Sequence, residues 1–303
     1  MDVQPPLRRL SENMIAIPES FVDNTQPQMT ETVARPFLKW AGSKTKVVKS
    51  LLPIFACGNG HRFIEPFVGS GVVFLNTNYA KSILSDTNND IISLFSALKE
   101  QGKSFIERCK RLFTSENNSK TRFYELRDEF NKCHNKTRRA TLFLYLNRHC
   151  FNGLCRFNKS GRFNTPFGSY GTVYFPSEEM EVFREKLLTT ELRTQDFRAT
   201  LAETGLGDIV YCDPPYVPLS KTANFTSYSA GGFSQQDQAD LRNLCLKAAR
   251  RGAIVLISNH DTPFTRDLYH NATEVIPILV SRTISCDGEN RKKAKELIAV
   301  FRK

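Results

Sequence analysis

Residues 209–216 read Ile209-Val210-Tyr211-Cys212-Asp213-Pro214-Pro215-Tyr216, an apolar run that stops at an acid and two prolines. The run has the length and composition of a buried strand. The prolines fix φ and force the residue before each of them out of the helical region, so the turn after the strand is rigid. Because open α/β sheets bind ligands at the carboxyl ends of their strands, this stretch predicts an α/β fold with a binding site at the turn.

The turn offers two fixed hydrogen-bond acceptors, the Asp213 carboxylate and the Pro214 carbonyl. A planar amine on a nucleobase can donate one hydrogen to each while the Tyr216 ring stacks on the base. Such an amine is a weak nucleophile, and acceptors aimed at its nitrogen stabilise the positive charge that develops during attack. We therefore predict that Asp213, Pro214, Pro215 and Tyr216 are catalytic, without a covalent enzyme intermediate. The alternative is an ordinary strand-terminating turn without chemistry.

The overall composition is that of a globular protein with one domain and a large insertion, or with two domains. Of its 303 residues 40% are hydrophobic, and the mean hydropathy is −0.36. No apolar run approaches the ~20 residues of a membrane span, and the first residues lack a signal-peptide pattern. Eight cysteines occur without a Cys-x-x-Cys pair, as expected for reduced thiols. We predict a cytoplasmic protein.

Positive charge is concentrated in one segment. The net charge is +11, and residues 103–176 carry 15 Lys or Arg against 5 Asp or Glu. Such a surplus favours a polyanion such as nucleic acid as the partner, because each neutralised phosphate releases counterions. A solvated basic face is the alternative. Cysteines and histidines also cluster between residues 133 and 155, but their spacing matches no zinc pattern, and no metal site is predicted.

Two further strand ends indicate a nucleoside cofactor. Residues 62–71 predict a short strand followed by a glycine turn, with a helix from Val72 to Asn76. A second strand over residues 82–85 ends in Asp86, where an acid usually binds ribose hydroxyls. The third glycine of a dinucleotide fingerprint is absent, which disfavours NAD.

The middle of the chain changes character twice. Residues 88–147 have helical periodicity, and their aromatic residues are predicted to form a core. Residues 151–175 interleave turns, basic residues and aromatics, as in a hairpin that reads DNA. The α/β pattern then resumes, with a capping box at Ser234 and Asp237. The predicted elements are a helix ending at 188, a strand at 191–194, a helix at 234–251, and strands at 253–257, 275–280 and 297–301.

Seven motifs, in this order along the chain, closely resemble those of the Dam family of DNA adenine-N6 methyltransferases, which recognise GATC and use S-adenosylmethionine. The resemblance covers about residues 35–303. The motifs are Phe37-Leu38-Lys39-Trp40-Ala41-Gly42, Glu65-Pro66-Phe67-Val68-Gly69, Leu144-Tyr145-Leu146-Asn147-Arg148, Phe151-Asn152-Gly153-Leu154-Cys155-Arg156, Tyr211-Cys212-Asp213-Pro214-Pro215-Tyr216, Ile257-Ser258-Asn259-His260-Asp261 and Arg291-Lys292-Lys293.

The resemblance implies a Rossmann-like class I methyltransferase sheet with an inserted helical DNA-recognition domain and a β-hairpin. Residues 35–87 and 177–303 would form the S-adenosylmethionine-binding catalytic domain, residues 88–176 the DNA target-recognition domain, and residues 1–34 a flexible extension. The implied partner is double-stranded DNA, with no membrane and no obligate protein partner, in the nucleoid of a bacterium or in a phage-infected cell. Base flipping is implied because an adenine inside a duplex cannot reach the methyl donor.

The resemblance also assigns binding residues. Those for S-adenosylmethionine are Trp40, Lys44, Phe67, Gly69, Asp86 and Asp213. Those for DNA are Lys39, Arg148, Phe151, Asn152, Leu154, Arg156, Asn158, Lys159, Pro166 and Tyr170. In the family pattern Lys39 contacts the first guanine of the site, Leu154 and Arg156 read the outer bases, Phe151 wedges into the duplex, and Asn152 contacts the space left by the flipped adenine.

The chain departs from the family pattern at three positions that lie outside the catalytic motif. Ser43 replaces a second glycine, Phe151 is commonly Tyr, and Ser169 stands where a phosphate-binding Arg is frequent. The target sequence is therefore less firmly implied than the chemistry. Two alternatives stay open: an adenine-N6 methyltransferase for another DNA sequence or for RNA, and a DNA-binding protein without activity.

Overall fold

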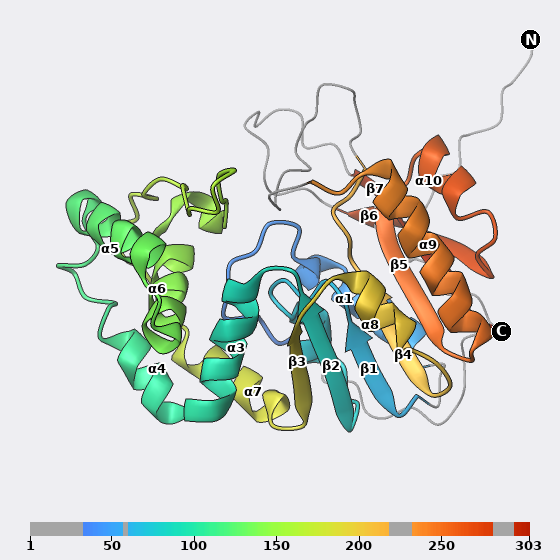
Figure 1. The fold of residues 1–303 in the computed structure, drawn as a ribbon, viewed down its shortest axis with the longest axis horizontal. Helices are drawn as coiled ribbons and strands as arrows, with labels where there is room; N and C mark the ends of the chain where they lie inside the picture. The colour runs from blue at the N-terminus through green and yellow to red at the C-terminus, as the bar shows by residue number, and fades with distance from the viewer. Residues whose placement is uncertain (1–32, 57–59, 218–231, 281–293) are drawn as a thin grey trace, which may run out of the picture.

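The computed structural model describes residues 33–56, 60–217, 232–280 and 294–303, and its centre is one seven-stranded sheet (Figure 1). The strands lie in the order β3-β2-β1-β4-β5-β7-β6. Their bounds are β1 (Arg62–Glu65), β2 (Lys81–Asp86), β3 (Thr190–Thr194), β4 (Asp208–Cys212), β5 (Ile254–His260), β6 (Glu274–Val280) and β7 (Ala294–Phe301). All the strands predicted from the sequence are present, and the predicted α/β fold class is confirmed.

The strand order places a topological switch between β1 and β4. The first five strands are parallel, and only β7 runs antiparallel to its neighbours β5 and β6. From β1 the chain adds β2 and β3 on one side, whereas β4 and β5 lie on the other. The loops after β1 and β4 therefore lead to opposite sides of the sheet, and such a switch point is where sheets of this kind bind ligands in a crevice.

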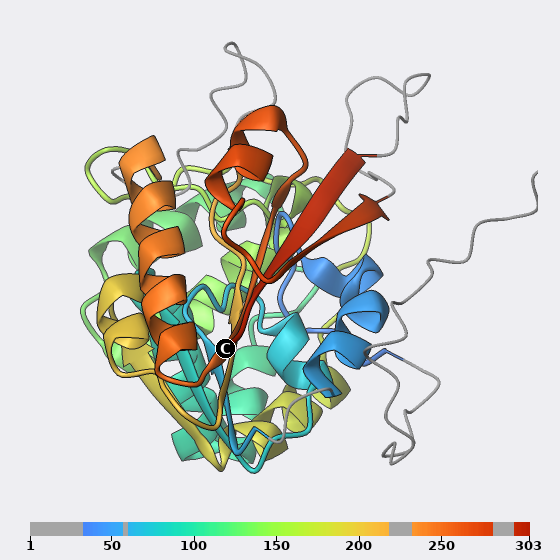
Figure 2. The ribbon, with the colours of Figure 1, turned by 90° about the vertical axis from the view of Figure 1, so that its right-hand side faces the viewer.

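Helices cover both faces of the sheet. Figure 2, which shows the sheet nearly edge-on, has α8 (Phe197–Ala202) and α9 (Gln235–Arg250) on one side and α1 (Val48–Ala56) and α2 (Val72–Asn76) on the other. Side chains alternate accordingly, since Phe63 and Tyr211 enter one hydrophobic core while Ile64 and Val210 enter the other. Burial on both faces explains why the central strands are almost wholly apolar.

A helical lobe lies beside the sheet. It contains α4 (Lys103–Lys110), α5 (Lys120–Lys132) and α6 (Lys136–His149), and it is joined to the sheet by α3 (Asn89–Gln101) and α7 (Ser177–Leu187) (Figure 1). The prediction that its aromatics are core is confirmed by the full burial of Phe123, Phe130 and Phe143. Phe95 of α3 packs 4.8 Å from Phe183 of α7, ring centre to ring centre, so one apolar core runs from sheet to lobe.

Helix boundaries follow the local capping chemistry. The predicted capping box at the start of α9 is confirmed, with reciprocal hydrogen bonds between Ser234 and Asp237. Asn135 likewise caps α6 by accepting a hydrogen bond from the Arg138 amide. Two short helices, α8 and α10 (Pro263–Leu268), and two 3₁₀ turns, η2 (Lys44–Lys46) and η3 (Phe151–Gly153), are not predicted from the sequence because they are too short for a periodic signal.

The hairpin expected within residues 151–175 takes a looser form, here called the 150–170 loop. Its two legs meet at two isolated antiparallel bridges, Cys150 with Phe167 and Phe157 with Phe163, and not along a continuous ladder. Phe163 is buried and packs on Phe130 of α5. The Asn131 side chain also hydrogen-bonds both the amide and the carbonyl of Phe163. The loop is thus fastened to the lobe as well as to itself.

Some predicted segments lie outside the described residues. These are the basic residues Arg291-Lys292-Lys293 and most of the 1–34 extension. The last two residues of that extension are described and pack on the core, and the Ala34 amide and carbonyl both bond the side chain of Asn76 on α2. Among the described residues, no helix is long and apolar enough to cross a membrane.

Candidate active site and DNA-facing surface

The turn after β4, here called the 213–217 turn, carries the predicted catalytic residues at the switch point of the sheet. Asp213 directly follows the buried strand, and its carboxylate lies 3.0 Å from the Lys44 ammonium. Burial raises the pKa of Asp213, whereas the charge and hydrogen bond of Lys44 oppose that rise. Lys44 therefore favours the ionised carboxylate, which is the form that accepts two hydrogen bonds.

Lys44 arrives from a distant part of the chain. It is the first residue of η2, is itself buried, and donates a hydrogen bond to the Gly42 carbonyl at 3.2 Å. Its ammonium also lies 3.9 Å from Glu296 Oε2 and 4.3 Å from the centre of the Tyr216 ring. The sequence assigned Lys44 to the cofactor, and the structure places it against the predicted catalytic acid.

Tyr216 is held on three sides. Its hydroxyl donates to Glu296 Oε2 at 3.0 Å, one ring face receives the Lys44 ammonium, and the ring meets His260 edge to face at 4.8 Å between centres. The ring orientation is therefore set by its neighbours before any base arrives. The other ring face is where a base would stack.

Buried amides pin the backbone of the 213–217 turn on either side of Tyr216. Gln238 Nε2 donates to the Pro215 carbonyl at 2.8 Å, and the Val217 amide donates to Asn259 Oδ1 at 3.2 Å. Asn259 Nδ2 then joins the two side chains by donating to Gln238 Oε1 at 3.1 Å. Asn259 and Gln238 are almost inaccessible to solvent, so these bonds do not exchange with water.

Sequence reasoning missed Gln238, although a signal for it exists. The buried residues of α9 are Gln238, Leu241, Cys245, Ala248 and Ala249, which recur at the spacing of one helix face. A glutamine on an apolar stripe needs a buried partner. Asn259 lies in a motif that the sequence singled out, but no role followed from the residues themselves.

The predicted cofactor residues Trp40, Gly69 and Asp86 lie together beyond β1 and β2. Gly69 has φ +47°, and a Cβ atom there would stand 2.7 Å from Trp40 Nε1. Asp86 Oδ2 accepts from the Gly69 amide at 3.1 Å, and its Oδ1 accepts from the Asn88 amide at 2.9 Å. Burial raises the pKa of Asp86, and these amides oppose the rise. Only glycine fits this turn, because its φ is positive and Trp40 fills the space beside it.

Phe67 belongs to an aromatic group that the sequence did not predict as a whole. Its ring stacks on Phe197 of α8 at 5.4 Å and meets Phe233 edge to face at 5.8 Å, centre to centre. Apolar rings at the switch point suit a flat aromatic ligand. Because Phe197 follows a polar pair, Gln195-Asp196, and begins a helix of only six residues, no periodic pattern marks it.

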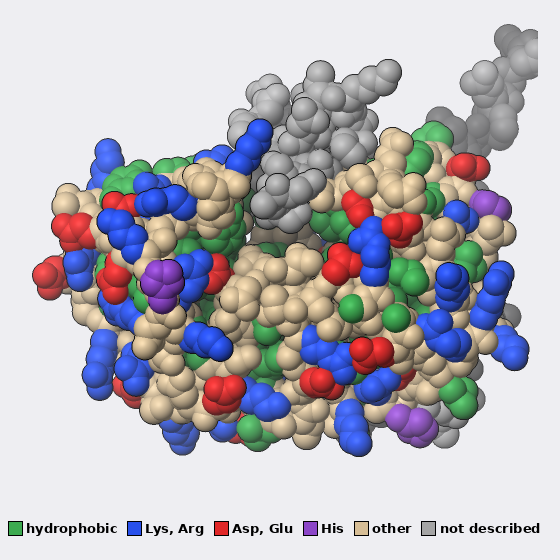
Figure 3. All heavy atoms as spheres, in the orientation of Figure 1, with side chains coloured by type: hydrophobic (Ala, Val, Ile, Leu, Met, Phe, Trp, Pro, Cys, Tyr) green, Lys and Arg blue, Asp and Glu red, His purple; other side chains and the backbone are tan. Residues whose placement is uncertain are grey.

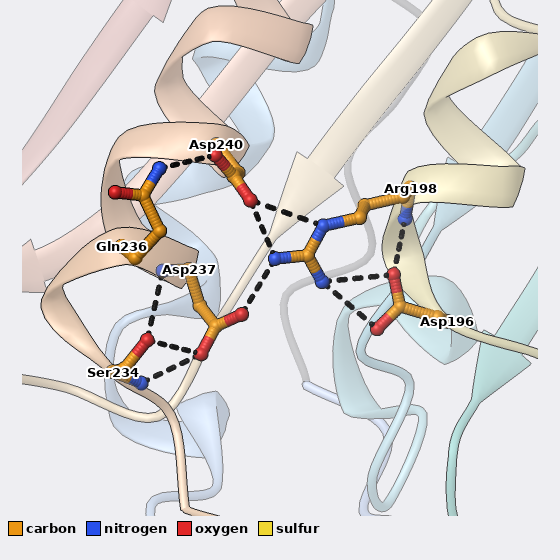
Figure 4. A network of polar contacts seen from close by, with 6 residues as sticks. All are labelled: Asp196, Arg198, Ser234, Gln236, Asp237 and Asp240. Atoms are coloured by element: carbon orange, nitrogen blue, oxygen red, sulfur yellow. Dashed lines mark hydrogen bonds and ion pairs between the residues drawn. The ribbon is translucent and has the colours of Figure 1, made fainter.

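A network of charges supports this aromatic group from outside. The Arg198 guanidinium bonds Asp237 Oδ1 at 2.6 Å and Asp240 Oδ2 at 2.7 Å on α9, and reaches Asp196 at the start of α8 (Figure 4). The start of α9 is thereby tied to α8. Gln238 follows Asp237 directly, so the network also helps to place the amide that holds Pro215.

Glu65, at the end of β1, is a further buried acid that sequence reasoning left without a role. Its carboxylate accepts one hydrogen bond, from the Phe74 amide at 3.3 Å. Burial raises its pKa well above the usual range, and the carboxylates of Asp213 and Asp86 add to the rise. Glu65 thus lies between the two predicted ligand-binding acids, and the signal for it is an acid at the end of a buried strand.

Lys39 and the 150–170 loop form a second cluster. The side-chain amide of Asn147 on α6 bonds both the amide and the carbonyl of Lys39, at 3.0 and 2.6 Å. The Lys39 ammonium donates to the Arg148 carbonyl at 3.2 Å and lies 4.2 Å from the Tyr170 ring centre. Burial, and then the charge of Arg148, lower the pKa of Lys39. The predicted DNA residues Lys39, Arg148 and Tyr170 are therefore neighbours.

Phe151 and Asn152 project from the tip of this cluster. Phe151 is 49% exposed, and Asn152 adopts the left-handed conformation with φ 52°. The Asn152 amide donates to the Tyr170 hydroxyl at 2.9 Å, which in turn donates to the Cys150 carbonyl at 3.2 Å. Phe151 is therefore exposed on a braced backbone, and its role as a wedge stays a prediction.

The other predicted DNA residues divide into exposed and structural groups. Arg156, Lys159 and Pro166 are exposed, whereas Leu154 is half-buried. Asn158 is a turn residue in this state, because its Oδ1 accepts hydrogen bonds from the amides of Ser160 and Arg162. Arg156 is oriented by its Nε bond to Asn164 Oδ1 at 2.9 Å.

In Figure 3, Lys and Arg side chains are spread over the helical lobe and over the remainder of the molecule, and the surface is hollowed between the two. Within the described residues, no group of three or more His, Cys, Asp or Glu side chains is arranged to hold a metal ion.

Comparison with known proteins fits the geometry. Residues 40–284 match the family model described as D12 class N6 adenine-specific DNA methyltransferase. A DNA adenine methylase from Serratia marcescens is 47% identical over 272 residues, which cover 88% of this chain and 98% of the relative. Those from Vibrio cholerae and Escherichia coli are 45% and 43% identical, each over 271 residues, covering 88% of this chain and 96% and 95% of the relatives.

Proposed function

The chain belongs to the D12 class of N6 adenine-specific DNA methyltransferases, and we propose that it methylates the adenine of GATC in double-stranded DNA after flipping that adenine out of the helix. The observation that carries the proposal is the 213–217 turn. There the Asp213 carboxylate, the Tyr216 ring and the Lys44 ammonium lie in one contact group at the switch point of the sheet.

The turn accounts for methyl transfer to an amine. A flipped adenine stacks on Tyr216 and donates its two N6 hydrogens to the Asp213 carboxylate and the Pro214 carbonyl. The cofactor would supply an electrophilic methyl group, its sulfonium would leave as a neutral thioether, and the fixed acceptors would stabilise the positive charge that develops on N6. N6 would then release one proton to water and recover a neutral amine. Lys44 favours the ionised form of Asp213, since its ammonium lies 3.0 Å from the carboxylate.

The residues around the switch point between β1 and β4 suit S-adenosylmethionine. Trp40 and the Gly69 turn would lie against the cofactor, Asp86 would accept hydrogen bonds from the ribose hydroxyls, and Phe67 would lie along the adenine ring. A Cβ at Gly69 would collide with Trp40, which shows how closely this turn is packed. The cofactor supplies an electrophilic methyl group on a sulfonium, while the protein supplies orientation and charge.

The 150–170 loop supports the DNA part of the proposal. Phe151 is exposed at the tip, where it can occupy the space between base pairs, and Asn152 lies beside it. Arg156 is exposed and can donate two hydrogen bonds to a guanine in the major groove. Lys39 reaches the same cluster from the loop that also carries Trp40. We assign the helical lobe, residues 88–176, to target recognition.

Methylation of defined duplexes tests this proposal. We expect transfer of labelled methyl groups to N6 of adenine in a GATC duplex, and at least about 10²-fold less on duplexes with one changed base pair. An RNA duplex of the same sequence separates DNA from RNA specificity. Equal methylation of all duplexes would contradict GATC recognition without touching the chemistry, and absence of methyl transfer to any of them would contradict the activity.

A further inference from the structure

Glu296 lies beside Tyr216 and Lys44, although the methyl transfer proposed above uses no second acid. It is the third residue of β7, which enters the sheet antiparallel to β5 and pairs it with His260. The antiparallel direction brings the start of β7 to the edge where the parallel strands end. Glu296 Oε2 accepts the Tyr216 hydroxyl at 3.0 Å and lies 3.9 Å from the Lys44 ammonium.

We propose that Glu296 is a positioning residue for methyl transfer, which fixes the Tyr216 ring by accepting its hydroxyl hydrogen. The inference rests on the proposed function and extends it to a residue that touches neither DNA nor cofactor. It acts through Tyr216, whose ring must already be parallel to the incoming base.

The contacts favour a role through the hydroxyl over a role through the charge. The Tyr216–Glu296 bond has ordinary hydrogen-bond length, whereas the 3.9 Å to Lys44 is at the limit of an ion pair. Lys44 is already engaged by Asp213 at 3.0 Å. His260 packs against the Tyr216 ring at 4.8 Å between centres, whereas Glu296 accepts the hydroxyl hydrogen at the distal end of that ring.

A ring fixed at both ends has a catalytic consequence. Gln238 and Asn259 fix its backbone, and Glu296 fixes its tip. Rotation of the ring would misplace the stacked base relative to the methyl donor, and small misplacements cost large factors in rate. Loss of Glu296 should therefore lower kcat while leaving cofactor affinity nearly unchanged.

Three variants test the route of action: Glu296→Ala, Glu296→Gln and Tyr216→Phe. Glu296→Ala should lower kcat by about tenfold or more, since one charged hydrogen bond is lost. Glu296→Gln keeps an acceptor of the same shape and should recover most of that loss. In the double variant Glu296→Ala with Tyr216→Phe, the second change should add less than about twofold, because both remove the same bond.

The measurements are single-turnover rates on one adenine-containing duplex, with cofactor affinity by calorimetry and melting temperature as folding controls. Glu274→Ala is the matched control, because Glu274 is a half-buried glutamate on β6 at the opposite end of the β6–β7 pair. Unchanged kcat in Glu296→Ala overturns the inference. Equal losses in Glu296→Ala and Glu296→Gln, or fully multiplicative effects with Tyr216→Phe, also overturn it. Because wild-type transfer is measured in the same assay, failure of the proposed function is seen separately.

Discussion

The 213–217 turn and the 150–170 loop hold their functional side chains in opposite ways. In the turn, every anchor comes from far along the chain: Lys44, Gln238 and Asn259 are buried, and Glu296 is half-buried. In the loop, most bonds join residues within about a dozen positions, and Phe151, Arg156 and Lys159 project outward. The first arrangement fixes geometry, and the second leaves side chains free to meet a surface.

The difference indicates which of the two regions tolerates small displacements of its side chains. Transfer chemistry depends on distances that must hold before the substrate arrives, so it needs anchors that water cannot replace. Recognition of a large, charged ligand sums many contacts, each of which can adjust during docking. Substitutions in the turn should therefore lower the methyl-transfer rate, whereas substitutions in the loop should change DNA affinity or sequence preference.

The largest effect is expected at Asp213. Asp213→Ala removes the acceptor for N6 and leaves Lys44 without its nearest counter-charge, and we expect the rate to fall ~10²- to 10³-fold. DNA affinity should change little, because the basic lobe is untouched. Rapid-quench methyl transfer and fluorescence anisotropy measure the two quantities. If the DNA affinity of Asp213→Ala fell as far as its methyl-transfer rate, the turn and the loop would not have separate roles.

Next in size is the removal of a buried amide. Asn259→Leu leaves the Val217 amide and the Gln238 carbonyl oxygen without partners, and each such loss costs about 1–3 kcal/mol. We expect a lower free energy of unfolding together with a lower kcat. Denaturant titration and turnover assays measure both, with the exposed Asn271→Ala as control. A stable but inactive variant would sharpen the comparison by separating fold from geometry.

Arg156 provides the corresponding test in the loop. If it reads a guanine, Arg156→Ala should cost about 1–3 kcal/mol on GATC and much less on a duplex substituted at that guanine. Methylation rates on single-base variants, for wild type and mutant, measure the difference. Arg162→Ala is the control, since Arg162 is an exposed arginine whose guanidinium lies 3.8 Å from Asp128. A uniform loss on all duplexes would assign Arg156 to a phosphate.

A smaller effect is expected at Lys159, which is exposed on the 150–170 loop. Lys159→Ala should weaken binding to all sequences alike and lower the slope of log affinity against log salt by about one unit. Binding isotherms between low and physiological salt measure the slope. A loss confined to GATC would instead give Lys159 a reading role.

The smallest effect is expected for the Arg198 network, which supports the turn from outside. The hydrogen bond from Arg198 lowers the pKa of Asp237 to about 2, below the unfolded value of about 3.9. The resulting stability is present above about pH 4 and is lost as pH falls toward about 2. Arg198→Ala should cost less than about 1 kcal/mol at pH 7, because the pair is partly exposed. Equal unfolding free energies of Arg198→Ala and the wild type at pH 2 would agree with this loss.

The sequence predicted those parts of the site that are contiguous in the chain. Asp213 and Tyr216 follow from one turn because the prolines and the strand before them define the geometry locally. Glu296 could not be found in this way, because its position opposite Tyr216 depends on β7 running antiparallel, which no local pattern states. The loop was expected as a hairpin from its turn residues. Burial of Phe163 against the lobe and the Asn131 bonds replaced the ladder with two bridges.

The two-way bond between Asn147 and the Lys39 backbone has a thermodynamic consequence. Lys39 is a proposed DNA contact, while Trp40 and Lys44 on the same short segment are proposed to contact the cofactor and the transfer site. This stretch of backbone would thus contact two ligands, and its hydrogen bonds to Asn147 on α6 restrict its movement. Any shift or stiffening of this stretch by one ligand must alter the affinity for the other, and linkage requires the same factor in both directions.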